Sequence, residues 1–580
     1  MTIKPPFFGL IAWPSLGLVV AFLGLAILAN AFAAFYITQE HYVYAWDWGG
    51  YWMTYLSFSE QLMHDPVNAL HWLVISIWND DYKLLPVLPL VPFEWLFGPS
   101  RLTYILAITN IALLPGVLVM GLLAQRILQT KSPKRSLSLL VLTSASILAL
   151  HSIWSPVLRG LPDVIGIVAI GGTLLLHFAK PLEEQRLNNL VWTGLLLCLL
   201  VLLRRWYAFW VIAFFPALAV AHGLNIYQRH GIGWQHYMTI TRNTVIIGLT
   251  FILALFTISA PFALRAIRTD YSDIYSAWRA STSLLEAAKL LPRDFGWIVI
   301  IGGLAGLAWL TVRKETRVVG SFLISQLLIV FVLFARTQDF GVQHHYLLVP
   351  GIALGIAVVV GSFWAQIKND MWRAASVGFV FTVLLANSAA AFFPGAARVA
   401  DILGSLVPQA RYYPLIRNDL AVLERLLNRL DKLELDQRGD IYILASSQLL
   451  NSNVMYSACQ FGPQRRFICD RILNTNDVDK RDGFPRQFLH AHYLVVASPT
   501  QYHQRAKDQR VIGVLAREVM EGHGVGASFH RLPVEFKLDK GVTAWVFEKI
   551  RPFERTDLDA LADEFIGYYP DKRDIFKTAD

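Results

Sequence analysis

The sequence predicts an all-α polytopic membrane bundle of about eleven spans, followed by a smaller α/β domain. Of its 580 residues, 55% are hydrophobic and 16% are charged, whereas a soluble domain has about 25% charged residues. The run Phe7–Tyr36 is longer than the roughly 20 apolar residues that cross a bilayer, and similar runs recur over the first two-thirds of the chain. After residue 393 the sequence turns polar, and short strand-like runs alternate with helical ones.

The first apolar run is interpreted as a membrane span and not as a cleaved signal peptide. Ala29-Asn30-Ala31 resembles a cleavage site, but the run is longer than the apolar core of a signal peptide, and further spans follow it. Hydropathy places the spans near Phe7–Phe35, Leu102–Leu123, Leu137–Val157, Val164–Phe178, Leu190–Leu203, Ala208–Ala221, Val245–Leu264, Trp297–Val312, Val318–Phe334, Tyr346–Trp364 and Ala374–Phe393.

Basic residues in the short loops predict a cytoplasmic N-terminus. The loop at residues 124–136 carries four basic residues and no acid, and the basic loops at 312–317 and 366–373 fall on the same side. The long loop at 37–100 has seven acids and one basic residue, Lys83. We therefore expect this loop and the C-terminal domain to lie outside the cytoplasm.

Two domains are expected: a membrane domain at residues 1–393, whose loop 37–100 carries interfacial helices, and an extracytoplasmic α/β domain at residues 394–580. Runs at residues 440–447, 492–498 and 542–550 read as strands of the second domain. Cys459 and Cys469 lie ten residues apart there, and we expect a disulfide between them because the compartment is oxidising. The net charge of +9 does not indicate nucleic-acid binding, since no Lys/Arg-rich run accompanies it.

Asp47 is the first candidate for chemistry, because it stands in a dense aromatic stretch just after the first span. In one interpretation it caps the helix that begins near Gly49, where carboxylates are favoured. In the other it is a general base, and Trp46 and Trp48 shape a wall against a sugar. The residues alone leave both interpretations open.

Asp80 and Asp81 form a second acidic site, followed directly by Tyr82 and Lys83. A solvated turn explains the two acids equally well. Alternatively, one of them binds a sugar hydroxyl or a divalent cation, since hard cations prefer carboxylate oxygens.

Basic residues gather at the predicted outer ends of the spans, against the usual charge bias. A charge near the hydrocarbon is costly, so a residue kept there is a functional candidate. Arginine matches phosphate oxygens with two parallel hydrogen bonds, which suits a lipid phosphate. The alternative is snorkelling of each side chain to the headgroups. The residues concerned are Arg159, Arg204, Arg205, Arg336, His344 and His345.

In their order and topology, these motifs resemble the GT-C superfamily of polyprenyl-phosphate-dependent glycosyltransferases, in particular protein O-mannosyltransferases and the lipid A aminoarabinose transferase. The resemblance covers roughly the first 390 residues. It rests on "WDWGGYW", "DDYKLLPVLPLVPFEWLFGPS", "LPDVIGIVAI", "LLRRWYAF" and "HHYLLVP". The chain departs from the family at three places. It has Arg204 or Arg205 where the family commonly has a lysine, His345 where the family usually has an arginine, and Tyr82-Lys83 in place of a Pro-Pro pair.

The resemblance implies an inverting transfer of a sugar from a polyprenyl phosphate to an acceptor hydroxyl on the outer face of a bacterial inner membrane. It implies that Asp47 is the base and that Arg204, Arg205 and the histidines hold the donor phosphate. Further substrate contacts are expected from Asp80, Asp81, Tyr82, Lys83, Arg159, His344, His345, Tyr346, Trp46 and Trp48. The acceptor class stays open between lipid, glycan and protein, as does a divalent cation at Asp80 or Asp81. Membrane lipids are the remaining expected partners.

Two other functions compete with this one. A lipid-linked saccharide flippase or transporter would also need aromatic and basic groups, although nearer the bilayer midplane and with inverted repeats. A non-catalytic assembly protein would use the C-terminal domain to bind partners. No P-loop, Ser-His-Asp order, paired CxxC or HExxH motif appears, and the cytoplasmic loops are too short for a nucleotide-binding domain.

Overall fold

The computed structural model describes residues 16–578 except 129–132, 231–233, 438 and 461–465. The chain divides into two compact units. The first unit comprises residues 1–39, 51–269 and 281–414, and the second comprises residues 40–50, 270–280 and 415–580. Two short segments, residues 40–50 and 270–280, are therefore separated in sequence from the rest of the second unit.

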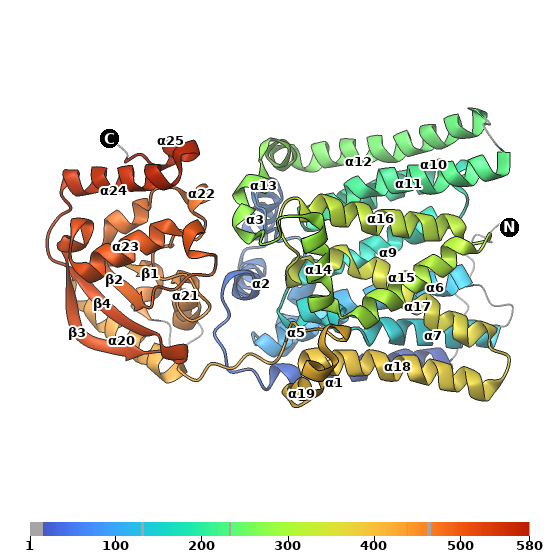
Figure 1. Ribbon diagram of the computed structural model, residues 1–580, viewed down its shortest axis with the longest axis horizontal. Helices are drawn as coiled ribbons and strands as arrows, with labels where there is room; N and C mark the ends of the chain where they lie inside the picture. The colour runs from blue at the N-terminus through green and yellow to red at the C-terminus, as the bar shows by residue number, and fades with distance from the viewer. Residues whose placement is uncertain (1–15, 129–132, 231–233, 438, 461–465, 579–580) are drawn as a thin grey trace. The chain divides into compact units, whose positions relative to one another are not determined.

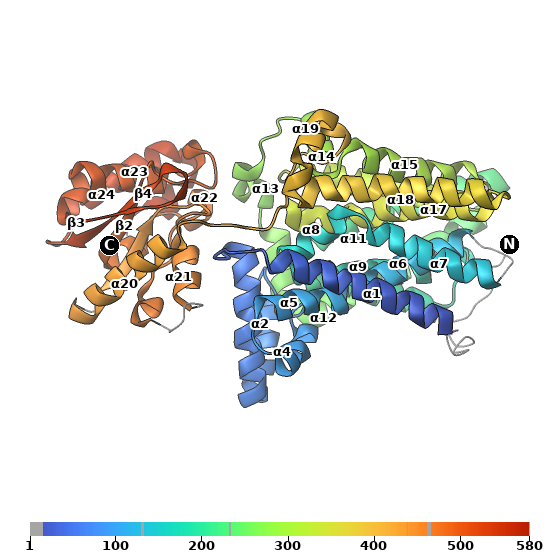
Figure 2. The ribbon, with the colours of Figure 1, turned by 90° about the horizontal axis from the view of Figure 1, so that it is seen from below.

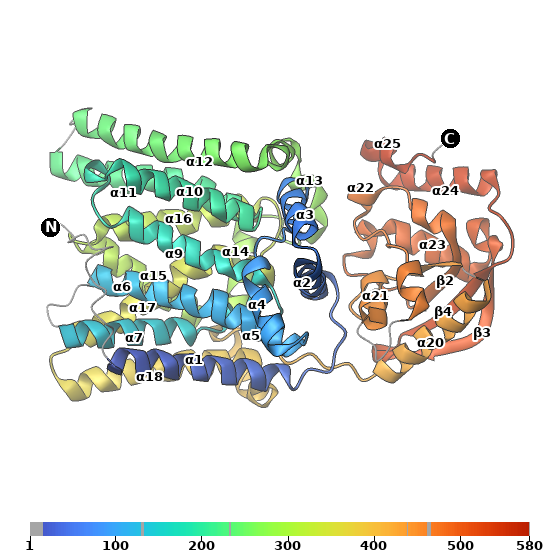
Figure 3. The ribbon, with the colours of Figure 1, turned by 180° about the vertical axis from the view of Figure 1, so that it is seen from behind.

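The first unit is a bundle of apolar helices that run side by side (Figures 1 and 3). Within the described residues, seven helical segments are long and apolar enough to cross a membrane: Leu16–Ile37 (α1), Arg101–Leu128 (α5 to α6), Tyr207–Gln228 (in α11), Trp234–Arg268 (α12), Arg317–Ala335 (α16), Val349–Gln366 (α17) and Asp370–Phe392 (α18). The chain is thus a multi-pass membrane protein.

The other predicted spans coincide with bent or shorter helices. Arg135–Leu148 in α7 and His151–Leu158 (α8) bend by 58°, and Leu284–Phe295 (α14) and Trp297–Val312 (α15) bend by 106°. The helical segments Pro162–His177 (η3 and α9) and Leu187–Leu203 (α10) are apolar but shorter. The predicted first span begins in residues that lie outside the described part of the chain.

Three helices connect α1 to α5: Trp46–His64 (α2), Pro66–Asn79 (α3) and Val91–Phe97 (α4). Figure 2 shows α2 running across the direction of the long helices. Asp65 caps α3 by accepting a hydrogen bond from the Asn68 backbone N–H, and Pro66 occupies the first turn, where its missing N–H costs nothing.

Helix α12 is broken near its end, and the residues at the break contact α3. Ser259 has non-helical backbone angles and Pro261 follows it, so the regular hydrogen bonding of the helix is interrupted. The Ser259 hydroxyl donates to the Ile77 carbonyl at 2.7 Å, and the Trp78 indole donates to the Ile258 carbonyl at 2.8 Å. These bonds fix the broken part of α12 against the last turn of α3.

The second unit is built on a four-stranded sheet with the order β1-β2-β4-β3. The strands are Asp440–Leu444 (β1), Ala491–Ser498 (β2), Phe529–Lys537 (β3) and Thr543–Lys549 (β4). β1 and β2 are parallel, and the other two pairs are antiparallel. The three predicted strand runs correspond to β1, β2 and β4; β3, with its mostly polar outer residues, was not predicted.

Helices cover both faces of this sheet (Figure 1). Alternate strand residues face two cores, as the period of two requires. Ile441 and Val495 pack with Leu420–Gln437 (α20) and Ser452–Gln460 (α21), whereas Leu444 and Val496 pack with Arg510–Glu521 (α23) and Arg555–Tyr568 (α24). The unit is therefore an α/β domain with a helical layer on each side.

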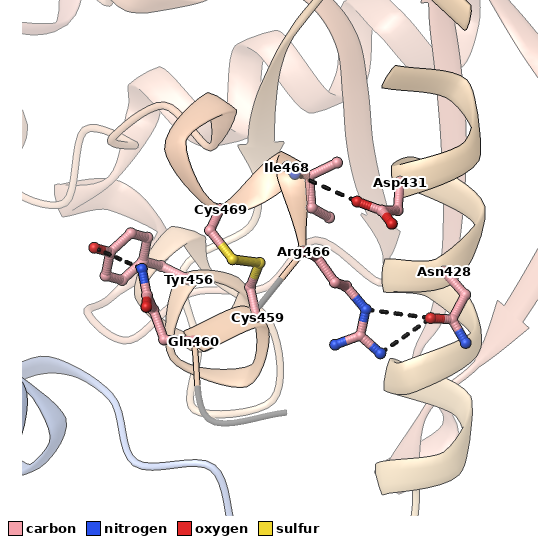
Figure 4. Close-up of a disulfide and its surroundings, with 8 residues drawn as sticks. All are labelled: Asn428, Asp431, Tyr456, Cys459, Gln460, Arg466, Ile468 and Cys469. Atoms are coloured by element: carbon pink, nitrogen blue, oxygen red, sulfur yellow. Dashed lines mark hydrogen bonds between the residues drawn. A yellow bond between two sulfur atoms is a disulfide. The ribbon is translucent and has the colours of Figure 1, made fainter. Parts of the chain in front are cut away.

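A disulfide joins Cys459, at the end of α21, to Cys469 (Figure 4). The Cα atoms are 5.6 Å apart, and both residues are buried in the core beside α20. Beside the disulfide, the Arg466 guanidinium donates to the Asn428 side chain, and the Ile468 N–H donates to Asp431 (Figure 4). The linkage thus ties the chain after α21 to the core of this unit.

Candidate functional site

Arg204 and Arg205 lie between two apolar helices of the first unit. Leu187–Leu203 (α10) ends at Arg204, whose extended backbone turns the chain into Tyr207–His230 (α11). The two arginines are only 1% and 5% exposed. Such burial requires partners, because an unpaired charge away from water is strongly unfavourable.

Arg204 contacts residues from three separate segments. Its guanidinium donates to the Tyr51 hydroxyl, Nε lies 3.6 Å from Oδ2 of Asp163, and Cζ lies 4.1 Å from the centroid of the Tyr82 ring. Tyr51 in turn donates to Oδ1 of Asp163 at 2.9 Å. The contact of Asp163 with Arg204 was not predicted from the sequence.

Arg205 pairs with Asp81, and Asp81 also lies 3.5 Å from Nη2 of Arg265. Arg265 stands in the last turn of α12, beyond the break at Ser259. The docking of α12 on α3 therefore brings a third arginine to the loop that carries Asp81. Sequence reasoning missed Arg265, although it has the same signal as Arg204, an arginine at the predicted outer end of a span.

Lys83 is fully buried, and its Nζ lies 3.4 Å from the centroid of the Phe262 ring, also beyond the α12 break. Within the described part of the chain, Nζ has no hydrogen-bond partner. Burial, with the nearby charge of Arg265, lowers the pKa of Lys83 to about 7. A cation–π contact offsets only part of the desolvation of an ammonium group, so Nζ is available to an anion.

These residues form one contiguous group, which we call the cationic cluster: Lys83, Arg204, Arg205, Arg265, Asp81, Asp163, Tyr51 and Tyr82. Three of its cations, Lys83, Arg204 and Arg205, are buried. The carboxylates of Asp163 and Asp81 lie beside the two arginines, whereas Lys83 Nζ has no hydrogen-bond partner among the described residues. The cluster thus brings together five of the predicted substrate-binding residues, namely Asp81, Tyr82, Lys83, Arg204 and Arg205.

A tight turn at Gly160 leads to Asp163 of the cationic cluster. Gly160 has a φ of +75°, and a Cβ there would lie 2.5 Å from Nη2 of Arg101, so only glycine fits. Arg101 donates to the Arg159 carbonyl at 3.0 Å, and the Arg159 guanidinium donates to the Tyr413 carbonyl at 3.0 Å. These contacts hold the turn that leads to Asp163.

Tyr346 joins the cluster through Tyr207. The two rings lie 4.4 Å apart, and the Tyr207 hydroxyl donates to the Asp163 carbonyl at 2.8 Å.

The two histidines occupy different surroundings. The ring nitrogens of His344 lie 2.9 Å from the Gln338 amide and 3.1 Å from the Gly341 nitrogen, so this side chain closes its own turn. His345 packs against Phe295 and Tyr412, and among the described residues its ring nitrogens have no hydrogen-bond partner. Neither ring makes a hydrogen bond with Arg204 or Arg205 in the described residues.

Asp80 contributes its backbone N–H to the end of α3, bonded to the Ser76 carbonyl. The described residues contain no group of three or more His, Cys, Asp or Glu placed to hold a metal ion. Asp81 is the ion-pair partner of two arginines, and this environment favours a salt bridge over a cation site.

Asp47 and Trp48 lie in the first turn of α2, in the segment that belongs to the second unit. Trp46, directly before Asp47, has a φ of +49°. Its indole Nε1 lies 3.4 Å from Oδ2 of Asp477, and its ring centroid lies 5.1 Å from that of His503. Trp46 therefore packs on the α/β domain.

No protein-family model matches the sequence, and no curated protein matches it significantly. Solved structures resemble it. ArnT from Cupriavidus metallidurans bound to undecaprenyl phosphate is 14% identical, with 92% of this chain and 98% of that chain covered and a TM-score of 0.46. AglB, an oligosaccharyltransferase from Archaeoglobus fulgidus in complex with an inhibitory peptide and a dolichol-phosphate, is 11% identical, with 82% and 69% covered and a TM-score of 0.44. These likenesses are weak.

Proposed function

We propose that the chain is a membrane glycosyltransferase that moves a sugar from a polyprenyl-phosphate donor to an acceptor hydroxyl. The buried cations of the cationic cluster carry this proposal, above all Lys83, whose Nζ has no hydrogen-bond partner among the described residues. Buried charge of one sign is strongly unfavourable unless an anion offsets it. A phosphate ester carries one to two negative charges, and its oxygens suit both the arginine fork and the point charge of a lysine.

The setting of the cluster favours a lipid phosphate over a free one. Arg204 and Arg205 follow the apolar helix α10, and Phe262 and Arg265 end the span α12. A polyprenyl chain lies in the bilayer with its phosphate at the interface, at the depth where span ends occur.

In the proposed reaction, Asp47 accepts the proton of the acceptor hydroxyl as its oxygen attacks the anomeric carbon. The new carbon–oxygen bond forms while the bond to the phosphate oxygen breaks, and the electron pair stays on the phosphate. Attack opposite the leaving group inverts the configuration through an oxocarbenium-like transition state. Lys83, Arg204 and Arg205 stabilise the phosphate charge, so no second acid is needed to protonate the leaving group.

The assignment of Asp47 rests on its place in the chain and on the motif it belongs to. Helix α2 carries Asp47 and, four residues later, Tyr51, which contacts Arg204. The predicted topology puts the reaction on the outer face of a bacterial inner membrane, with the C-terminal unit extracytoplasmic and a lipid, glycan or protein as acceptor.

Asp47→Asn tests this function against both the helix cap and the transporter. A general base contributes roughly 10²- to 10⁴-fold to turnover, whereas Asn caps a helix as well as Asp does. We expect the Asp47→Asn variant to bind undecaprenyl phosphate as tightly as the wild type does. Turnover is measured as the release of undecaprenyl phosphate from an undecaprenyl-phosphate sugar, with host membranes as the source of acceptor, and it should be at least about 10²-fold slower in the variant.

Asp65→Asn is the matched control, because Asp65 is a helix-capping acid of the same loop. Its turnover should stay at the wild-type level. Wild-type turnover in a folded Asp47→Asn variant would remove Asp47 from the reaction, and a transporter would show no release of the sugar in either protein.

A further inference from the structure

Trp46 has a backbone conformation that bulky residues rarely adopt. Its φ of +49° lies in the left-handed region, where a residue with a large side chain is an outlier. Among the described residues, the only other non-glycine with a positive φ is Lys540, in an exposed turn next to Gly541. Since such a conformation persists only where the surroundings enforce it, the contacts of Trp46 require an explanation.

The segment that carries Trp46 is fixed along its length to the second unit. The His41 N–H donates to the Leu415 carbonyl at 2.9 Å, and the Arg417 N–H donates to the His41 carbonyl at 2.9 Å. Ala45 is buried in the core beside α20 and α21, with Val43 packed against it. The chain therefore enters Trp46 from a fixed direction.

The indole itself is held at the carboxyl ends of β1 and β2, the edge at which α/β domains usually form binding sites. Asp477 accepts from the Trp46 indole, and His503 packs against the indole ring. Ser446, two residues after the end of β1 and fully buried, donates to Oδ1 of Asp477 at 2.8 Å and lies 2.6 Å from Nδ1 of His503.

Further bonds fix the backbone of Asp477. Its N–H donates to Oδ2 of Asp482 at 2.9 Å, and its carbonyl accepts from the buried Gln509 amide at 3.1 Å. Gln509 also lies 3.0 Å from Nδ1 of His503. The carboxylate that meets Trp46 thus belongs to a connected hydrogen-bond network with little freedom to move.

We propose that Ser446, Asp477 and His503 are positioning residues for Asp47: they hold Trp46 in its left-handed conformation and thereby set the start of α2 and the direction of the Asp47 side chain. This inference rests on the proposed role of Asp47 as the base. In this role the three residues act on the reaction through Trp46.

The strained residue Trp46 directly precedes Asp47, so a change in its backbone conformation moves Asp47. If the anchor is lost, Trp46 relaxes to a negative φ, and the first turn of α2 shifts. A displacement of about 1 Å at a reacting group lowers turnover by up to about 10²-fold. Donor binding should stay unchanged, because Lys83 and Arg204 hold the phosphate.

A spin label at residue 47 tests the positioning without needing the sugar or the acceptor. Cys198 is buried and the other two cysteines form a disulfide, so Asp47→Cys supplies one accessible thiol in the full chain. We expect an immobilised nitroxide spectrum in this background. Adding Asp477→Ala should remove the immobilised component, and Asp477→Asn should restore it, because the amide oxygen still accepts from the indole.

Asp479→Ala is the matched control, since Asp479 is a buried acid of the same segment that contacts Tyr569 and not Trp46. It should leave the label immobilised. A label equally immobilised with Asp477→Ala, or equally mobilised by both alanine variants, would overturn the proposal.

Trp46 provides a second comparison, read by turnover. Glycine adopts a positive φ without a steric penalty, so Trp46→Gly should retain more turnover than Trp46→Ala. Equal losses, with weaker donor binding in both, would show instead that the indole contacts the sugar. If Asp47→Asn keeps wild-type turnover, the base assignment fails while the label result still stands or falls by itself.

Discussion

Replacing Asp81 by Asn is expected to tighten phosphate binding while it weakens the unliganded protein. Asp81 pairs with the buried Arg205 and lies 3.5 Å from Nη2 of Arg265. Asn keeps the size of the side chain and removes the carboxylate that lies beside Arg205 and Arg265. The net charge of the cluster then rises by one unit.

Coulomb's law gives the scale of the effect. Removing a unit charge about 7 Å from the phosphate, at an effective dielectric constant of about 20, changes the interaction energy by about 2.4 kcal/mol. Reorientation of Arg205 and entry of water cancel part of this, so binding should tighten by about 1 kcal/mol, or roughly fivefold. Without ligand, Arg205 loses its ion pair with Asp81, and the free energy of unfolding should fall by about 1–3 kcal/mol.

The assay is titration of the detergent-solubilised chain with undecaprenyl phosphate, followed by native mass spectrometry and by thermal unfolding with and without the lipid. Asp65→Asn is the control, because this acid caps α3 at the end away from Asp81. Weaker binding in Asp81→Asn, with Asp65→Asn unchanged, would refute the reasoning and show that Asp81 contacts the ligand or a cation.

Three further predictions concern stability. Burial raises the pKa of Asp479 to about 6, above its unfolded value of about 3.9. The folded unit therefore binds this proton more tightly than the unfolded chain and loses stability as the pH rises through 4–6. In chemical denaturation, Asp479→Asn should raise the free energy of unfolding by about 2 kcal/mol at pH 7 and leave it unchanged at pH 4. Gly160→Ala should cost about 1–3 kcal/mol in thermal unfolding, since its Cβ meets Arg101 at a positive φ. Replacing Cys459 and Cys469 by Ser should cost the second unit about 2–4 kcal/mol, because the unfolded chain regains its loop entropy, and an unchanged melting temperature would contradict this.

The sequence predicts the membrane bundle well because hydropathy reports the solvent of each segment directly. Over the residues that the structure describes, the eleven predicted spans coincide with apolar helices, two of them in bent pairs and two in shorter helices. The bends after Leu148 and Phe295 depend on packing and leave no clear signal in hydropathy. β3 was missed for a related reason: it is an edge strand whose residues are mostly exposed, so it lacks an apolar run.

The candidate site was predictable in its residue types and not in its pairing. Arg204 and Arg205 were singled out by the cost of placing charge near lipid, and Lys83 by its place directly after Asp80, Asp81 and Tyr82. Their partners come from segments far apart in sequence: Asp163 lies 41 residues from Arg204, and Asp81 lies 184 residues from Arg265. Likewise, the contact of Trp46 with Asp477 spans 431 residues, and no local pattern encodes it.

A cryo-electron microscopy map of the chain in lipid nanodiscs with undecaprenyl phosphate tests the central claim most directly. We predict phosphate density within about 3 Å of Lys83 Nζ and of the Arg204 or Arg205 guanidinium, the distance of a charge-assisted hydrogen bond. Lys83 should then turn from the Phe262 ring toward the phosphate. Phosphate density away from the cationic cluster, with Lys83 still against Phe262, would contradict the proposed donor site.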